Sequence, residues 1–305
     1  MTILEIFRNF TVAIANVDLS RSSAESAADR EYRFLLDQKK TIAEVGLRST
    51  VNLQNMFFQD ASSGRAVFYG FRNVTIDEAI HDLIRHTNRQ HQWFLAEAYE
   101  LFEEFVKRAY AFMGMQDPTL WPLRDFGAIQ WNEIQSKDYQ WYLEQARAKR
   151  DSPLAMLRQF RKVLPRMASV EVDNRQKCDL QVAVTLVGHM RHQIVHARGI
   201  ISDMTSFAED LVRKLGHSGK GMAPHLEFVA EVLVVNKEDG EIHLLNLPAS
   251  DSSGTPGFHY DIFNEMVRYL LVYAHQVYLS LGGEWMEKFE EIPPLDKNSP
   301  IFSND

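Results

Sequence analysis

The chain has 305 residues, of which 45% are hydrophobic and 24% charged, a balance typical of a globular protein in water. Its formal net charge of −8 argues against a protein that coats nucleic acid without specificity. The single cysteine, Cys178, excludes an internal disulfide, and no apolar run approaches the ~18–20 residues of a membrane span. Residues 1–19 lack the pattern of a signal peptide, so we expect a cytoplasmic protein that makes no membrane contact.

The first 70 residues are predicted to form an N-terminal helical extension. Apolar residues at helical spacing indicate a short amphipathic helix over residues 2–18, and the polar stretch Ser20–Ser26 indicates a turn. A second, long helix is predicted over residues 24–59, because this stretch is rich in good helix formers and has no proline. The short aromatic segment Ala66–Phe71 fits either a strand or a loop.

Residues 75–285 are predicted to form one helical domain. Thr75-Ile76-Asp77-Glu78 has the form of a capping box and begins a helical pattern that extends to Met113. Forty residues is long for one helix, so we allow for a break near Thr87–His91. Further helices are predicted over residues 128–150, 153–164, 175–198, 204–215 and 260–281.

One β-hairpin is predicted at about residues 228–247. Phe228–Val235 and Ile242–Leu247 are two runs of β-forming residues, and Asp239-Gly240 between them is a strong turn signal. Residues 286–305 are predicted to be a tail. The predicted fold is therefore mainly α, an antiparallel helical bundle with one β-hairpin and the N-terminal helical extension.

The helix predicted over residues 175–198 ends in a cluster of basic side chains. Its apolar residues recur at heptad-like spacing as far as Ile194, and Gly199 is predicted to stop it. Burying arginine or histidine without partners costs several kcal/mol, so these groups should face a groove, a partner chain or each other. The cluster consists of Arg191, His192, His196 and Arg198.

The spacing Arg-x-x-x-x-His, formed by Arg191 and His196 with the polar His192 directly after the arginine, resembles the signature of the HEPN superfamily. The aromatic and acidic run Tyr99–Phe105 also resembles the first helices of that family. The resemblance covers about residues 75–281 and implies an all-α bundle in which two motifs meet across a homodimer. Many members are metal-independent endoribonucleases, often toxins or effectors of phage defence, so an antitoxin or regulatory partner is also expected.

The resemblance implies RNA cleavage by transesterification, in which the ribose 2′-OH attacks the adjacent phosphorus and leaves a cyclic phosphate. His196 is the candidate acid or base, because an imidazole exchanges protons near neutral pH. Arg191 would stabilise the charge that develops on phosphorus. His192, one helical turn before His196, would orient it or contact RNA. The substrate supplies the nucleophile, so we expect no cofactor and no resident metal.

Basic residues also concentrate just before this helix. Between Arg147 and Lys177 there are nine basic and three acidic residues, so the segment carries +6 and the remainder of the chain −14. The segment is either a set of solvated helix faces or a positive rim that holds a phosphate backbone. On the second interpretation, the candidate RNA contacts are Arg158, Arg161, Lys162 and Arg198.

Three alternatives stay open. Basic side chains at a helix C-terminus interact favourably with the macrodipole, by about 0.3–1 kcal/mol each, which is a purely structural role. The chain could be a non-catalytic HEPN-like module that binds RNA or protein. His189, His192 and His196 share one helical stripe that could hold a metal, although no H-E-x-x-H motif occurs. The loop Gly216–Gly221 lacks the spacing of a phosphate-binding loop.

Overall fold

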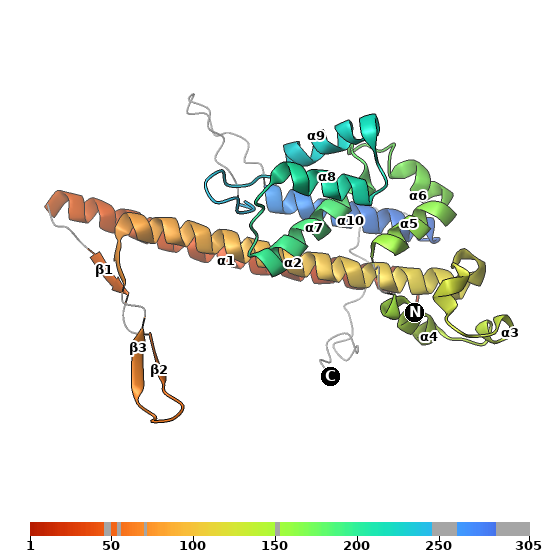
Figure 1. Cartoon of the computed structure of the whole chain (residues 1–305), viewed down its shortest axis with the longest axis horizontal. Helices are drawn as coiled ribbons and strands as arrows, with labels where there is room; N and C mark the ends of the chain where they lie inside the picture. The colour runs from red at the N-terminus through yellow and green to blue at the C-terminus, as the bar shows by residue number, and fades with distance from the viewer. Residues whose placement is uncertain (46–49, 54–55, 70–71, 150–152, 246–260, 285–305) are drawn as a thin grey trace.

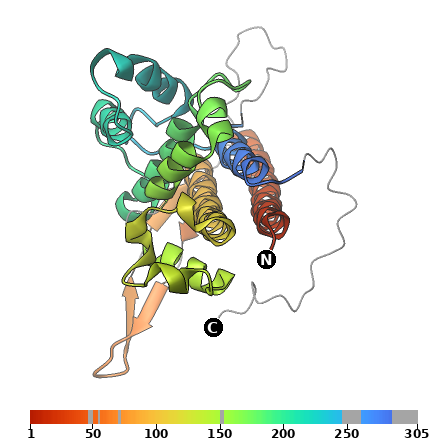
Figure 2. The ribbon, with the colours of Figure 1, turned by 90° about the vertical axis from the view of Figure 1, so that its right-hand side faces the viewer.

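A computed structural model describes residues 1–45, 50–53, 56–69, 72–149, 153–245 and 261–284. The protein is mainly α, as predicted. Two long helices, α1 (Ile3–Val45) and α2 (Ile76–Gln116), run side by side along the longest axis, and most other helices gather around the C-terminal half of α2 (Figures 1 and 2). Within the described ranges, none of the helices has the length and apolarity needed to cross a membrane.

Helix α1 is continuous, so the turn predicted at Ser20–Ser26 was wrong. Ser20 and Ser26 lie inside the helix, where their hydroxyls donate to backbone carbonyls one turn earlier instead of capping a new helix: Ser20 Oγ to Asn16 O at 3.0 Å, and Ser26 Oγ to Ser22 O at 2.9 Å. The N-terminal part of α1 buries Ile6, Phe7 and Phe10 in the main core. This segment is therefore part of the helical body.

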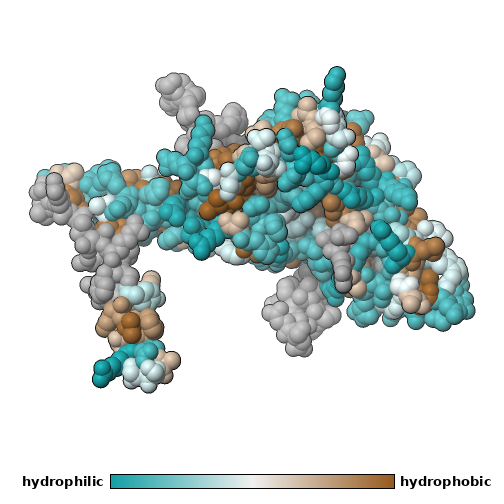
Figure 3. All heavy atoms as spheres, in the orientation of Figure 1, coloured by the Kyte–Doolittle hydropathy of each residue, from teal (hydrophilic) through white to brown (hydrophobic). Residues whose placement is uncertain are grey.

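The helix predicted to reach residue 59 ends at Val45, and four short strands follow. Strand β1 (Thr50–Leu53) pairs with β4 (Arg72–Thr75), and β2 (Met56–Gln59) pairs with β3 (Ala66–Tyr69), both antiparallel. The β2–β3 hairpin projects from the far end of the α1–α2 pair and exposes apolar side chains (Figure 3). Aromatic residues favour strands, and this preference outweighed the helix-forming residues before them. The exposed side chains are Met56, Phe57, Phe58, Val67, Phe68 and Tyr69.

Helix α2 begins at the predicted capping box. The Thr75 hydroxyl accepts from Glu78 N at 3.2 Å, and the Glu78 carboxylate accepts from Thr75 N at 2.7 Å. No break occurs at residues 87–91, because the polar side chains there dock another segment. Asn88 Nδ2 donates to Ile242 O at 2.9 Å, and Asn88 Oδ1 accepts from Leu244 N at 2.8 Å. A buried polar group costs little when it is hydrogen-bonded in this way.

The chain then forms a series of shorter helices. The helix predicted over residues 128–150 is split, and the Asp138 side chain caps its second half by accepting from Trp141 N at 3.0 Å. The elements in order are η1 (Pro118–Leu120), η2 (Leu123–Phe126), α3 (Trp131–Ile134), α4 (Tyr139–Ala148), α5 (Leu154–Val163), α6 (Pro165–Val170), α7 (Leu180–Ala197), α8 (Met204–Lys214), η3 (Gly219–Met222), α9 (Ala223–Val232) and α10 (Ile262–Ser280).

The hairpin predicted at residues 228–247 is much shorter over its described residues, 228–245, and residues 246–247 lie outside the described ranges. Its first half is helical, because α9 extends to Val232. The predicted turn does form, with Gly240 at φ 71°, but the segments beside it are joined only by an isolated bridge between Val235 and Ile242. A short apolar run fits a buried helix or a strand equally well by periodicity. The predicted tail, residues 286–305, lies outside the described residues.

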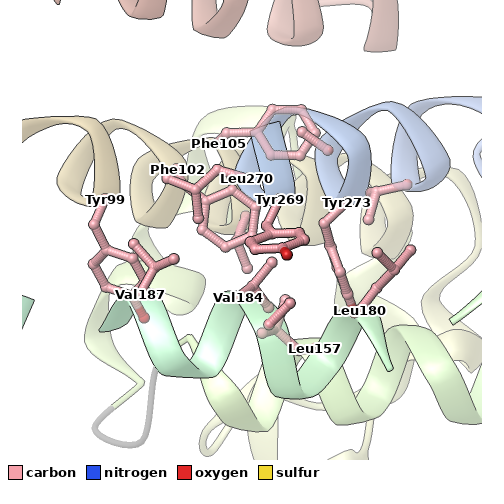
Figure 4. Close-up of a cluster of buried hydrophobic side chains, with 14 of the residues drawn as sticks. Tyr99, Phe102, Phe105, Leu157, Leu180, Val184, Val187, Tyr269, Leu270 and Tyr273 are labelled. Carbon is pink, nitrogen blue, oxygen red and sulfur yellow. The ribbon is translucent and has the colours of Figure 1, made fainter. Parts of the chain in front are cut away.

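Helix α7 lies in the centre of the body and contacts both α2 and α10. Its side chains Leu180, Val184 and Val187 face the aromatic residues Phe102 and Tyr273 of those two helices (Figure 4). Each of these five side chains is at most 1% exposed. Burying an aliphatic side chain of this size stabilises the fold by roughly 1.5–3 kcal/mol, so α7 is held firmly. Its C-terminal end is thereby placed at the surface.

Candidate functional site

The C-terminal end of α7 carries the Arg191–His196 motif to the surface. Ile194 is buried at 3% exposure, whereas His192, His196 and Arg198 are exposed. The helix ends as predicted, because Arg198 and Gly199 both adopt positive φ angles of 57° and 74°. The last turn therefore presents two histidines and an arginine to solvent.

Two glycines allow this helix to approach α2 closely. A Cβ atom on Gly188 would lie 2.5 Å from Tyr99 Oη, and one on Gly199 would lie 2.5 Å from Gln92 Oε1. Real Cβ atoms do not come so near, so each close approach requires glycine or a displaced neighbour. Packing against α2 thus fixes the position of α7 at both ends of the motif.

His192 and His196 lie one above the other on the exposed face, with ring centroids 4.7 Å apart and an interplanar angle of 51°. This arrangement follows from their four-residue spacing on one helix. Partial burial, and then the neighbouring His196, lower the pKa of His192 below its usual 6.5. His192 is therefore mainly neutral at pH 7 and can accept a proton or a hydrogen bond.

Arg191 points away from the histidines toward α2. Its Nη2 donates to Glu100 Oε1 at 2.7 Å. Its Nε is buried and has no hydrogen-bond partner among the described residues. We did not single out Glu100 from the sequence, although it belongs to the aromatic and acidic run Tyr99–Phe105. The structure explains that run: Tyr99 packs on α7, and Glu100 holds the motif arginine.

A pocket of about 610 Å³ opens between α7 and α8 beside this face. Burial, and then the positive charge of Lys214, lower the pKa of His189 to about 4, so His189 is neutral at pH 7. Neither Arg191 nor His196 is among the described residues that line the pocket. The lining residues are His189, His192, Gln193, Ala197, Ile200, Ile201, Ser202, Asp203, Ser206, Phe207, Asp210 and Lys214.

Within one chain the two motif residues do not converge. Five residues on a helix correspond to a rotation of about 140°, so Arg191 and His196 lie on different sides of α7. Arg191 contacts α2, whereas His196 is exposed beside His192. The His189–His192–His196 stripe, considered as a metal site, is not a metal-sized cluster in the part of the chain that the structure describes.

Several residues of the basic segment pair with acids elsewhere. Arg147 bonds Glu104 at 2.6 Å, and Lys149 pairs with Asp125. These pairs reduce the positive charge that this surface can offer to a phosphate backbone. The segment is therefore not a uniformly positive rim.

The four predicted RNA contacts lie in different surroundings. Lys162 and Arg198 are exposed. Arg158 is also exposed and donates to the backbone carbonyl of Lys214, which places it beside the pocket wall. Arg161 is instead partly exposed, and its guanidinium is directed toward the buried Glu171. The exposed residues and Lys214 are the cations best placed to meet a phosphate.

Arg161 belongs to a buried network with Glu171 and Tyr273. The Tyr273 hydroxyl donates to Glu171 Oε1 at 2.6 Å, and Arg161 Nε lies 3.3 Å from Glu171 Oε2 without hydrogen-bonding geometry. Arg161 Nη1 also donates to Gln181 Oε1 at 3.0 Å. Burial raises the pKa of Glu171 to about 7, although Tyr273 and Arg161 oppose this shift. Sequence reasoning did not find this network, because its members are far apart in the chain.

Comparisons of the chain with protein-family models, with curated proteins and with solved structures find no match. A functional interpretation therefore depends on the residue pattern and on the geometry of the α7 surface.

Proposed function

We propose that this chain is a HEPN-like, metal-independent endoribonuclease whose cleavage site is the exposed end of α7. The proposal depends chiefly on one observation: the ring centroids of two exposed imidazoles, His192 and His196, lie 4.7 Å apart on the helix that also carries Arg191, which a carboxylate holds on another side. Such a set can move protons and stabilise negative charge without a metal.

In the proposed reaction, the ribose 2′-oxygen attacks the adjacent phosphorus and the bond from phosphorus to the 5′-oxygen breaks. His196 accepts the proton of the 2′-OH, and a protonated imidazole gives a proton to the departing 5′-oxygen. The products are a 2′,3′-cyclic phosphate and a 5′-hydroxyl. His192 is neutral at pH 7, so it can orient His196 or hydrogen-bond to RNA without repelling a protonated neighbour.

Arg191 supplies the permanent positive charge. Glu100 occupies one of the five N–H donors of the guanidinium and limits its motion, so the side chain is oriented before substrate arrives. A fork of this shape matches the oxygens of a phosphate. Exposed cations near the pocket, Arg158, Arg198 and Lys214, would hold the flanking backbone.

A homodimer is part of the proposal, because one chain leaves Arg191 and His196 on different sides of α7. A second copy packed across a two-fold axis at this surface would place its arginine and histidine opposite those of the first. The two motifs together would then surround one phosphate. Light scattering that finds only monomers at micromolar concentration would contradict this arrangement.

The test is cleavage of single-stranded RNA in EDTA by the wild type, Arg191→Ala and His196→Ala. We expect cyclic-phosphate ends from the wild type and a loss of about 10²–10⁴-fold in rate for the histidine variant. The cleavage rate of the arginine variant should fall by a factor of similar order. His86→Ala and Arg33→Ala, which remove exposed residues outside the motif, are matched controls and should cleave normally. Unchanged cleavage by His196→Ala would overturn its assignment.

A non-catalytic RNA- or protein-binding module is the second candidate. It is favoured by the Arg191–Glu100 ion pair, which already satisfies part of the arginine charge, and by the absence of both motif residues from the described lining of the pocket. RNA binding without cleavage by the wild type in filter-binding and cleavage assays would select this candidate.

A further inference from the structure

We propose that Asp179, His217 and His225 bind a zinc ion that joins the N-terminus of α7 to the α8–α9 region. The three residues come from separate places: the residue before α7, the loop after α8, and the first turn of α9. The site departs from the sequence-based expectation of no resident metal. It is independent of the proposed nuclease function.

The geometry is close to that of a bound ion. One ligand atom from each of the three residues lies within 4.8 Å of the other two. Zinc binds nitrogen and oxygen at about 2.0–2.2 Å, so two ligands of a tetrahedral ion are about 3.4 Å apart. Side-chain rotations that move each ligand atom by about 1 Å would therefore be enough to close the site around zinc.

Asp179 can act as a helix cap and a metal ligand at once. Its Oδ1 accepts from Gln181 N at 2.9 Å and from Val182 N at 3.1 Å, which caps α7. No described residue donates to its Oδ2, so this oxygen is free to bind a cation. The negative charge of the carboxylate also offsets the partial positive charge of the helix N-terminus, which would otherwise repel a cation.

The two imidazoles lie close enough together for small movements to turn them toward one ion. The ring centroids of His217 and His225 are only 4.1 Å apart, with an interplanar angle of 41°. Both residues are partly buried, and no described side chain or backbone group hydrogen-bonds to either ring. Partly buried polar groups normally find partners, and a shared metal ion would supply one to both rings.

Nearby charges act on the site in opposite directions: Arg161 disfavours positive charge at His225, and Asp179 favours it. Asp179 contributes the carboxylate of the proposed site. Two imidazoles with one carboxylate oxygen are a set that suits zinc, and water would complete the fourth position.

A zinc ion here would stabilise the fold. Asp179 and His217 are 38 residues apart, and the ion would cross-link them. The site is distant from the proposed cleavage centre, because the 17 residues from Asp179 to His196 span about 25 Å along α7. Removing the metal should therefore lower stability and leave the α7 surface intact.

The experiment uses full-length protein without an affinity tag, stripped with EDTA, dialysed and titrated with ZnCl₂ in a calorimeter. We expect one equivalent of zinc to bind and the melting temperature to rise by about 5 °C or more with excess zinc. Co²⁺ in place of zinc should give the intense visible absorption of a four-coordinate ion. A wild type that binds no zinc would overturn the proposal.

Variants identify the ligands. His217→Ala and His225→Ala should each bind zinc at least 10- to 100-fold more weakly than the wild type, because a loss of this size is typical even when a hydrogen-bond partner of a metal ligand is removed. Asp179→Asn should also bind less tightly while it keeps the cap, because asparagine caps helices as well as aspartate. His86→Ala, which removes an exposed histidine of α2, should bind as the wild type does. Equal affinity in all four variants would mean adventitious binding and would refute the site.

Discussion

Two histidine pairs lie near opposite ends of α7, and they arise in different ways. His192 and His196 belong to one helix, are exposed, and lie 4.7 Å apart because four residues make about one helical turn. His217 and His225 come from a loop and another helix, are partly buried, and lie 4.1 Å apart because the chain folds back on itself.

The difference concerns what each pair can bind. An exposed pair on one helix is open to a large substrate, and its rings can exchange protons with water. A partly buried pair beside a carboxylate is shielded by three elements of the fold, which suits a small ion. The first pair is therefore assigned to chemistry on RNA and the second to metal binding.

The largest expected effect is a loss of RNA cleavage when a histidine of the exposed pair is removed, and the same loss in the partly buried pair would contradict the two assignments. His196→Ala should reduce RNA cleavage by about 10²–10⁴-fold. His225→Ala should cleave as the wild type does when both are measured in EDTA below their melting temperatures. Product ends separated on denaturing gels give both rates. A larger loss in His225→Ala than in His196→Ala would reverse the two assignments.

The second effect concerns the buried carboxylate behind the Asp179 end of α7. The pKa of Glu171 is raised from 4.5 to about 7 in the fold, so the folded state binds more protons than the unfolded state between these values. The contribution of Glu171 to stability is thus complete below pH 4.5 and is lost as the pH rises through 7. The slope reaches about 1.4 kcal/mol per pH unit, or about 3 kcal/mol in all.

Glu171→Gln removes this dependence and can still accept from the Tyr273 hydroxyl. The variant should therefore gain stability relative to the wild type as the pH rises from about 5 to about 8. Urea unfolding at several pH values measures the difference. Parallel stability curves for the two proteins would show that Glu171 titrates normally in the fold.

A smaller effect separates the two roles of Asp179. Asp179→Ala removes an N-cap and should lower the free energy of unfolding by about 1 kcal/mol in EDTA, whereas Asp179→Asn should change it by a few tenths. Both variants should lose zinc affinity. Unfolding curves with and without zinc distinguish the roles, and an alanine variant that binds zinc normally would exclude Asp179 as a ligand.

The smallest expected effect is on the ion pair that holds Arg191. Glu100 is 57% exposed and Arg191 28% exposed at the side chain, so their pairing should contribute at most about 1 kcal/mol to stability. A double-mutant cycle with Glu100→Gln and Arg191→Ala measures this coupling. A coupling of several kcal/mol would give the pair a structural role and weaken the case for catalysis.

Local signals in the sequence predicted local structure well. The capping box at Thr75 and Glu78, the stop at Gly199 and the neighbouring His192–His196 pair all depend on residues within about one helical turn. Their physical causes lie in the backbone and in side-chain spacing, which a sequence displays directly.

Features made by distant contacts could not be predicted in the same way. Asp179, His217 and His225 are brought together only by the packing of α8 against α7 and of α9 against α8, and no spacing rule marks them. The length of the helix that begins at Thr75 led us to allow for a break near Thr87–His91, but Asn88 in that stretch binds the backbone of a segment about 150 residues later. Tertiary partners decided both outcomes.

The close contacts of Gly188 with Tyr99 and of Gly199 with Gln92 have a consequence for the evolution of this fold. Each glycine leaves no room for a methyl group unless its large neighbour on α2 moves or becomes smaller. In related chains that keep this packing, the two positions of each pair should therefore covary. A residue larger than glycine at position 188 should occur together with a residue smaller than tyrosine at position 99. Evolution at either position should therefore have required a compensating substitution at the other.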